Sequence, residues 1–273
     1  MNSASAKYTE KDAIAFNNAG YEFTAKKQYS EAVECFQKAI EISPKIAIYH
    51  ANLGNVYFAV AKYSEAGEQY RAALQINDKY ANAYQGLAGV EMVSGSLAKG
   101  IEMIDRALAL DPYNPGYLAT KGYIAIKQND NDLAIRCFEL SLKYDPASVP
   151  TLNDLGVLYV DRHQMGDAEK LFREAIKLAP DNSEAYNNLG VLLQRQKKHK
   201  EALSNLQIAV RLSPEWPKAV YNLGVSYLHL KDKSSATGLL RTLQNIDPTL
   251  ARQLFDGIHR NMLIDASLAD RPR

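Results

Sequence analysis

The chain has 273 residues, of which 47% are hydrophobic and 23% are charged. Its 32 basic and 31 acidic residues give a formal net charge of +1, so it lacks the basic excess that non-specific phosphate binding needs. No stretch approaches the ~18 consecutive apolar residues of a membrane span. We therefore expect no nucleic-acid partner and no direct membrane insertion. The expected location is the cytoplasm, either free or peripheral to a membrane assembly.

The start of the chain predicts a flexible arm followed by two helices. Residues 1–8 are small and polar without periodicity, which is typical of a loose N-terminal arm. Thr9 and Asp12 have the spacing of a helix cap. Apolar residues then recur at helical spacing around Gly20 and again around Phe36, which predicts two amphipathic helices.

The same two-helix pattern returns every 34 residues. Each predicted first helix has a small central residue, which lets packed helices approach closely. A second small residue follows about twelve places later and a large one about sixteen places later. All but one of the repeats end with proline, which cannot continue a helix but can begin the next. The central small residues are Gly20, Gly54, Ala88, Gly122, Gly156, Gly190 and Gly224.

A 34-residue helix-turn-helix unit with Leu-Gly and then Ala, Phe, Ala and Pro at these spacings resembles the tetratricopeptide repeat. The resemblance implies an all-α fold, a right-handed α-solenoid of seven such repeats plus a C-terminal capping helix, whose first helices line a concave groove. Within a solenoid over residues 9–265, the expected repeats are 13–46, 47–80, 81–114, 115–148, 149–182, 183–216 and 217–250, followed by the cap helix over 251–265. Residues 266–273 are expected to be a disordered tail.

No catalytic, metal-binding or cofactor-binding constellation is evident in the sequence. The five histidines lie far apart, and Cys35 and Cys137 are three repeat lengths apart, which argues against a disulfide. The glycines between residues 86 and 100 lack the strand and the Gly-Lys-Ser/Thr ending of a phosphate loop. The basic run at 195–200 falls at a predicted turn, where a solvated surface is the simpler interpretation. We expect a non-catalytic protein without metal or cofactor.

The candidate binding surface is the face of each first helix opposite the packed face. Positions two before, one after and four after the small residue lie on it. An amide at the first of these can donate to a peptide carbonyl and accept from a peptide N–H, and asparagines have that role in peptide-binding proteins that this sequence resembles. Exposed apolar rows at the other two positions are typical of a partner site. The predicted site residues are Asn18, Tyr21, Asn52, Asn55, Phe58, Met92, Tyr123, Ile126, Asp154, Val157, Asn188, Val191, Asn222, Val225 and Leu228.

Several alternatives stay open at this point. The amides could bond water or adjacent repeats instead of a ligand, and tight curvature could bury the apolar rows. The leading functional hypothesis is an adaptor that binds a peptide or partner protein in the groove. The alternatives are a self-assembling structural scaffold that organises a multiprotein or membrane-associated assembly, which would form homo-oligomers, and the repeat portion of a larger protein glycosyltransferase.

Overall fold

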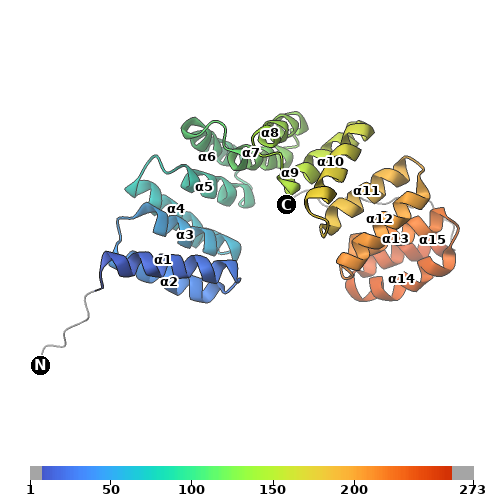
Figure 1. Ribbon diagram of the computed structural model, residues 1–273, viewed down its shortest axis with the longest axis horizontal. Coiled ribbons are helices and arrows are strands. Elements are labelled where there is room, and N and C mark those ends of the chain that lie inside the picture. Colours follow the sequence, from blue (N-terminus) through green and yellow to red (C-terminus); the bar gives the residue numbers. More distant parts are fainter. Residues whose placement is uncertain (1–7, 260–273) are drawn as a thin grey trace, which may run out of the picture. The chain divides into compact units, whose positions relative to one another are not determined.

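The computed structural model describes residues 8–259, which form two compact units, one ending at Cys137 and the other beginning at Phe138. This part of the chain contains fifteen α-helices and no strand (Figure 1). The predicted all-α fold of helical hairpins is confirmed for these residues. Most of the expected N-terminal arm, the last six residues of the expected cap helix (260–265) and the expected tail (266–273) lie outside the described residues.

Helices α1 to α14 form seven hairpins, in which the odd-numbered helix is the first and the even-numbered helix is the second, and α15 follows the last hairpin. Unit 1 contains α1 (Glu10–Ala25), α2 (Tyr29–Ile42), α3 (Ala47–Ala59), α4 (Tyr63–Ile76), α5 (Ala81–Val93), α6 (Leu97–Leu110) and α7 (Pro115–Lys127). Helix α8 (Asn131–Tyr144) includes the division between the units. Unit 2 contains α9 (Val149–Asp161), α10 (Met165–Leu178), α11 (Ser183–Arg195), α12 (His199–Leu212), α13 (Pro217–His229), α14 (Lys233–Ile246) and α15 (Pro248–His259).

Local sequence signals start and end these helices. The backbone N–H and the hydroxyl of Thr9 both donate to the Asp12 carboxylate at 2.7 Å, which confirms the predicted cap of α1. Each hairpin turn has one residue in the left-handed region, at the same position of every repeat. Only the third repeat uses glycine there, Gly95 with φ +78°, and glycine adopts this conformation without steric cost. The other left-handed residues are Lys27, Ala61, Asn129, His163, Lys197 and Lys231.

The hairpin cores form where the first helix has no side chain. A Cβ added at Gly20 would lie 2.7 Å from the ring of Phe36, and one added at Gly156 would lie 2.5 Å from the ring of Phe172. The large residue of the second helix therefore fills the space beside the glycine. At Gly190 the backbone oxygen of the small residue Ala202 also lies 3.4 Å from the added Cβ, so the two small residues of that hairpin come together as well.

First helices lie side by side within each unit. In unit 1, α3 contacts α5 and α5 contacts α7. In unit 2, α9 contacts α11, α11 contacts α13, and α13 contacts α15. Helix α15 also packs against α14, and its Leu254 lies 2.7 Å from the position of a Cβ added at Gly224. Helix α15 therefore covers the last hairpin, as the predicted cap requires.

Candidate partner-binding surface

The predicted site residues lie in three rows along the first helices, and we call this surface the first-helix wall. It consists of the three rows two before, one after and four after the small residue of each repeat. Val157 and Val225 of this wall also belong to the hydrophobic clusters of the hairpins. In unit 1 the predicted wall residues are Asn18, Tyr21, Asn52, Asn55, Phe58, Met92, Tyr123 and Ile126. In unit 2 they are Asp154, Val157, Asn188, Val191, Asn222, Val225 and Leu228.

The wall of unit 1 is accessible to solvent. Asn18 and Asn55 are exposed, and Tyr21 has half of its surface exposed. Apolar side chains continue the wall along the next first helices, and each of them is half-buried. This group comprises Phe58, Met92, Tyr123 and Ile126. Unit 1 therefore presents a mixed surface of amide, aromatic and aliphatic groups.

One wall asparagine of unit 1 is used inside the protein. The side-chain N–H₂ group of Asn52 donates to Asn17 Oδ1 at 2.8 Å, and its Oδ1 accepts from the Tyr21 hydroxyl at 2.8 Å. The residue is only 4% exposed. This amide therefore joins adjacent repeats, as one of the alternatives anticipated.

Asn55 remains available as a donor. Its Oδ1 accepts from the Tyr70 hydroxyl at 2.8 Å, and burial raises the pKa of Tyr70, so that hydroxyl stays protonated and keeps donating. The exposed N–H₂ group of Asn55 can then donate to a peptide carbonyl.

The wall of unit 2 is buried. Asn188, Val191, Asn222 and Val225 have no exposed surface, and Val157 has 5%. Two further residues in the same rows are also buried, Val160 at 1% and Gln194 at 5%, as is Asp154 at 6%. Leu228 alone among the predicted residues of this unit is half-buried.

The amide of Asn222 repeats the link seen in unit 1. Its N–H₂ group donates to Asn187 Oδ1 at 2.8 Å, in the same register as the bond between Asn52 and Asn17. The Gln194 N–H₂ group donates to the Asn222 carbonyl oxygen at 3.3 Å, while the side-chain oxygen of Gln194 is buried without a hydrogen-bond partner. This wall therefore contains buried hydrogen-bonding capacity that the first helices do not use among themselves.

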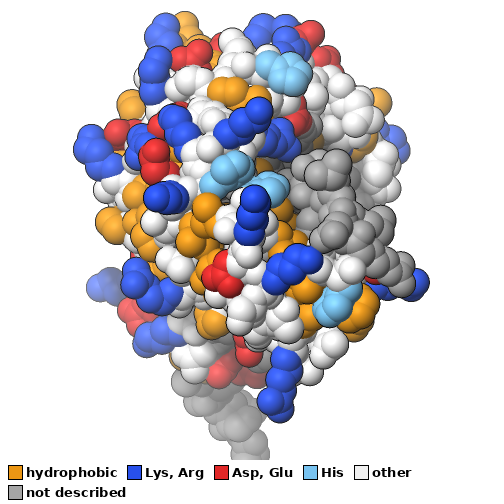
Figure 2. All heavy atoms as spheres, turned by 90° about the vertical axis from the view of Figure 1, so that its right-hand side faces the viewer, with side chains coloured by type: hydrophobic (Ala, Val, Ile, Leu, Met, Phe, Trp, Pro, Cys, Tyr) orange, Lys and Arg blue, Asp and Glu red, His pale blue; other side chains and the backbone are white. Residues whose placement is uncertain are grey.

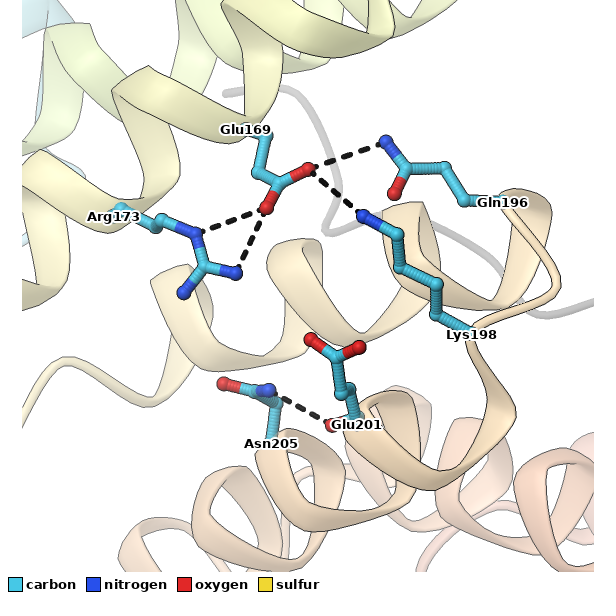
Figure 3. Close-up of polar contacts among 6 residues, drawn as sticks. All are labelled: Glu169, Arg173, Gln196, Lys198, Glu201 and Asn205. Atoms are coloured by element: carbon cyan, nitrogen blue, oxygen red, sulfur yellow. Dashed lines mark hydrogen bonds and ion pairs between the residues drawn. The ribbon is translucent and has the colours of Figure 1, made fainter.

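The basic run at the turn after α11 is tied to the neighbouring hairpin (Figure 3). Glu169 accepts from Arg173 at 2.8 Å and from Gln196 at 3.3 Å, and Lys198 Nζ lies 3.6 Å from its carboxylate. Partial burial acts to raise the pKa of Glu169, but these hydrogen bonds and positive charges outweigh it and lower the pKa. Gln196 and Lys198, which belong to the basic run, therefore have a structural role in holding two hairpins together. In Figure 2, basic side chains are spread among hydrophobic ones and do not form one continuous patch on the face shown.

Among residues 8–259, no group of three or more His, Cys, Asp or Glu side chains could hold a metal ion. Sequence reasoning missed that His199 and His229 come together, with ring centroids 5.0 Å apart, because their 30-residue separation differs from the repeat length. Every helix in the described part of the chain is too short or too polar to traverse a bilayer.

Sequence reasoning also missed a cavity away from the first-helix wall. It has a volume of about 500 Å³ and lies where α4, α5 and α6 meet. The Arg106 guanidinium lies 5.9 Å from the centroid of the Tyr84 ring, and both residues line it together with Arg71, Lys99 and Glu102. The lining also includes Glu91, so the cavity has three basic and two acidic side chains and favours neither a strongly acidic nor a strongly basic ligand.

The stacked helical hairpins make this chain an α-helical repeat protein, and comparisons with known protein families point to the same class. A family model described as "Tetratricopeptide repeat" matches residues 51–115, 153–215 and 192–251, and another with the same description matches 115–148. A model described as "TPR repeat" matches 20–60. The chain belongs to the tetratricopeptide repeat family. A search of the curated proteins gives no match.

Solved structures show the same fold. The chain resembles one from the APC/C hetero-tetramer Cut9–Hcn1 (TM-score 0.73, 18% identity, 79% of this chain and 43% of that chain), so it spans less than half of that protein. It also resembles pilF of Pseudomonas aeruginosa, with a TM-score of 0.70 and 19% identity over 77% of this chain and 96% of that chain. A tetratricopeptide repeat protein of Parabacteroides merdae matches with a TM-score of 0.63 and 18% identity over 91% of this chain and 99% of that chain. At these identities the likeness concerns the fold alone.

Proposed function

We propose that the chain is a non-catalytic adaptor that binds a peptide or a segment of a partner protein on its first-helix wall. The observation that carries the proposal is the accessible wall of unit 1, where Tyr21 and Asn55 are exposed beside half-buried Phe58 and Met92. Apolar groups gathered on an accessible surface are typical of a binding site. Membership of a repeat family that generally works through protein interactions supports the same function.

The chemistry of this wall suits an extended segment with apolar side chains. The Asn55 amide can donate to a main-chain carbonyl, and Tyr21 and Phe58 can contact side chains that alternate along the segment. The near-neutral net charge favours a polypeptide over a nucleic acid. The proposal involves no cofactor and no catalytic step.

Selection of peptides from a random library on the full chain tests this function. For a selected peptide, Tyr21→Ala combined with Asn55→Ala should weaken the affinity by at least about 10-fold, since anchors in an interface contribute more than ~1 kcal/mol each. Leu110→Ala is the matched control, because Leu110 is 42% exposed but lies on the second helix α6. Equal affinities for all three proteins would disprove the assignment of the wall, and the absence of any selected peptide would count against the function itself.

A second candidate function, a self-assembling scaffold, is favoured by the exposed apolar groups at the first hairpin. Ile14, Ile42 and Ile46 line a cavity of about 410 Å³ near the start of α1, and Ile14 is 52% exposed. Sedimentation velocity from about 1 to 100 µM should then show association that Ile14→Asp abolishes. A sedimentation coefficient that stays monomeric over this range would dismiss the scaffold.

A further inference from the structure

The cavity where α4, α5 and α6 meet lies at a kind of helix junction that recurs along the chain, and we call it the α5 cavity. At three other junctions, a tyrosine on the first helix forms a hydrogen bond with the preceding second helix, 20 residues earlier. The bonded pairs are Tyr57 with Gln37 at 3.3 Å, Tyr159 with Glu139 at 2.6 Å and Tyr227 with Gln207 at 3.2 Å. Each of these bonds joins two neighbouring hairpins.

Arg71 and Glu91 take the places of this bonded pair at the α5 cavity, since they lie 34 residues after Gln37 and Tyr57. Both side chains line the cavity, but neither forms a hydrogen bond or an ion pair with any residue in the described range 8–259. Gly67 leaves room for the guanidinium, because a Cβ added there would lie 3.3 Å from Arg71 Nη1. The bond that joins hairpins elsewhere is therefore replaced here by two unpaired charges.

Two further junctions lack the tyrosine, but there the residue on the second helix has another partner. Asp105 accepts from Lys121 Nζ at 2.7 Å, and Arg173 donates to Glu169 at 2.8 Å. At the six junctions between successive repeats, Arg71 is thus the one residue in this position that has no such partner within the described part of the chain. An ionised group at a cavity gains free energy when a ligand of opposite charge pairs with it.

The charges of the α5 cavity are complementary to a single carboxylate. Arg106 and Glu102 form an ion pair at 2.8 Å and so neutralise each other. Lys99, like Arg71, lines the cavity and has no bonding partner among residues 8–259. Two positive charges therefore face one negative charge, that of Glu91, and one added carboxylate balances them. An arginine can bind a carboxylate through two parallel hydrogen bonds, which adds geometric selectivity.

The rest of the lining suits an apolar side chain next to that carboxylate. Leu87 is 6% exposed, and Leu74, Tyr84 and Met103 are half-buried around the same space. The volume of about 500 Å³ is sufficient for one or two side chains and the main chain between them. Glu91 is half-buried and can accept a hydrogen bond only from a donor that enters the cavity, such as a main-chain N–H group.

We propose that the α5 cavity is a second peptide-binding site, which takes a segment with an Asp or Glu side chain close to a large apolar side chain. Arg71 and Lys99 bind the carboxylate, Glu91 accepts from a main-chain N–H group, and the apolar side chain packs on Leu87 and its neighbours. This inference goes beyond the adaptor function, because the site lies away from the first-helix wall and needs none of its residues.

Peptide selection on the full chain with Tyr21→Ala and Asn55→Ala tests the site without binding at the accessible wall. The selected peptides should contain an acidic residue within about four positions of a large apolar one, the spacing that neighbouring side chains of a peptide can bridge. Adding Arg71→Gln and Glu91→Tyr copies the bonded pair of Gln37 and Tyr57. This change should close the cavity and weaken binding of a selected peptide at least about 10-fold, while the urea midpoint does not fall.

The matched control is Arg241→Gln, which changes an exposed arginine at the position of Arg71 on α14 and should leave the affinity unchanged. A second variant, Lys99→Gln, alters an exposed side chain outside the cores and should weaken binding about 3-fold or more. Equal affinities for the parent, the Arg71→Gln/Glu91→Tyr variant and the Lys99→Gln variant would overturn the proposal, as would selected peptides without an acidic residue.

Exchange of charges tests the chemistry of recognition directly. Arg71→Glu should reject a selected peptide and bind a synthetic version in which lysine replaces the acidic residue, reversing the preference between the two peptides by about 10-fold or more. An unchanged preference would show that Arg71 does not contact the carboxylate. Binding through Tyr21 and Asn55 is measured in a separate selection on the native chain, so either proposal can fail alone.

Discussion

Units 1 and 2 share one hairpin design but present different first-helix walls. The cores are equivalent: Phe36 in unit 1 and Phe172 in unit 2 are buried beside Gly20 and Gly156, respectively. The walls differ, because Tyr21 is half exposed whereas four wall residues of unit 2 have no exposed surface. The comparison teaches that the repeat pattern governs how hairpins pack, while the positions outside the pattern decide how exposed each part of the wall is.

The largest expected effect tests whether the two cores are equivalent. Phe36→Ala and Phe172→Ala should each lower the free energy of unfolding by about 3–5 kcal/mol, because each leaves a cavity beside a glycine that cannot fill it. Urea denaturation followed by circular dichroism measures both. A loss below ~1 kcal/mol for one of them would break the equivalence of the units.

Two glycines of unit 2 give the next largest effect. A Cβ at Gly156 would lie 2.5 Å from the Phe172 ring, so Gly156→Ala should destabilise the protein by about 1–3 kcal/mol. Gly166 on α10 has no atom within 4 Å of an added Cβ, so Gly166→Ala should stabilise it by about 0.5–1 kcal/mol through better helix propensity. The sign of each change in the denaturation midpoint checks this. A loss of stability in both variants would mean that Gly166 is as confined as Gly156.

The sequence predicted the packing of the repeats well because packing depends on residues that recur in phase. The spacing of Gly20 and its counterparts was enough to predict the hairpins. It was not enough to predict that Asn52 bonds to Asn17, since that bond depends on the crossing of two first helices 35 positions apart. The burial of Val191 was one of the alternatives left open, because the identity of an apolar residue does not show whether neighbouring helices cover it. Whether the wall residues bind a partner stays a prediction.

A pair of asparagines tests the difference between the walls. Asn222→Ala should cost about 1–3 kcal/mol, because it leaves the buried Asn187 oxygen without the N–H₂ group that bonds to it at 2.8 Å. Asn18 has the same position in the first repeat but is exposed, so Asn18→Ala should change stability by no more than ~0.5 kcal/mol. Chemical denaturation of both variants measures the contrast. Equal effects would show that the walls do not differ in burial.

The smallest effects come from two carboxylates of unit 2 whose pKa values shift in opposite directions. For Glu169, hydrogen bonds from Arg173 and Gln196 and the charge of Lys198 lower the pKa despite partial burial. Its stabilising contribution is therefore present above the unfolded pKa near 4.5 and is lost as the pH falls through the folded value. Burial raises the pKa of Glu184, so its contribution is present below the unfolded pKa and is lost as the pH rises through the folded value.

The two glutamine variants should accordingly differ in sign at neutral pH. Glu169→Gln should destabilise the protein near pH 7, and Glu184→Gln should stabilise it, because it removes a charge that burial disfavours. The Glu184 difference should shrink first, as the pH falls through the raised folded pKa of this carboxyl, which lies above 4.5. The Glu169 difference should shrink only below pH 4.5, as the pH falls toward its lowered folded pKa. Urea midpoints at several pH values between about 3 and 7 measure this. If Glu184→Gln is neutral across that range, the carboxylate is hydrated in solution, and the burial of α11 does not extend from its wall residues to its first turn.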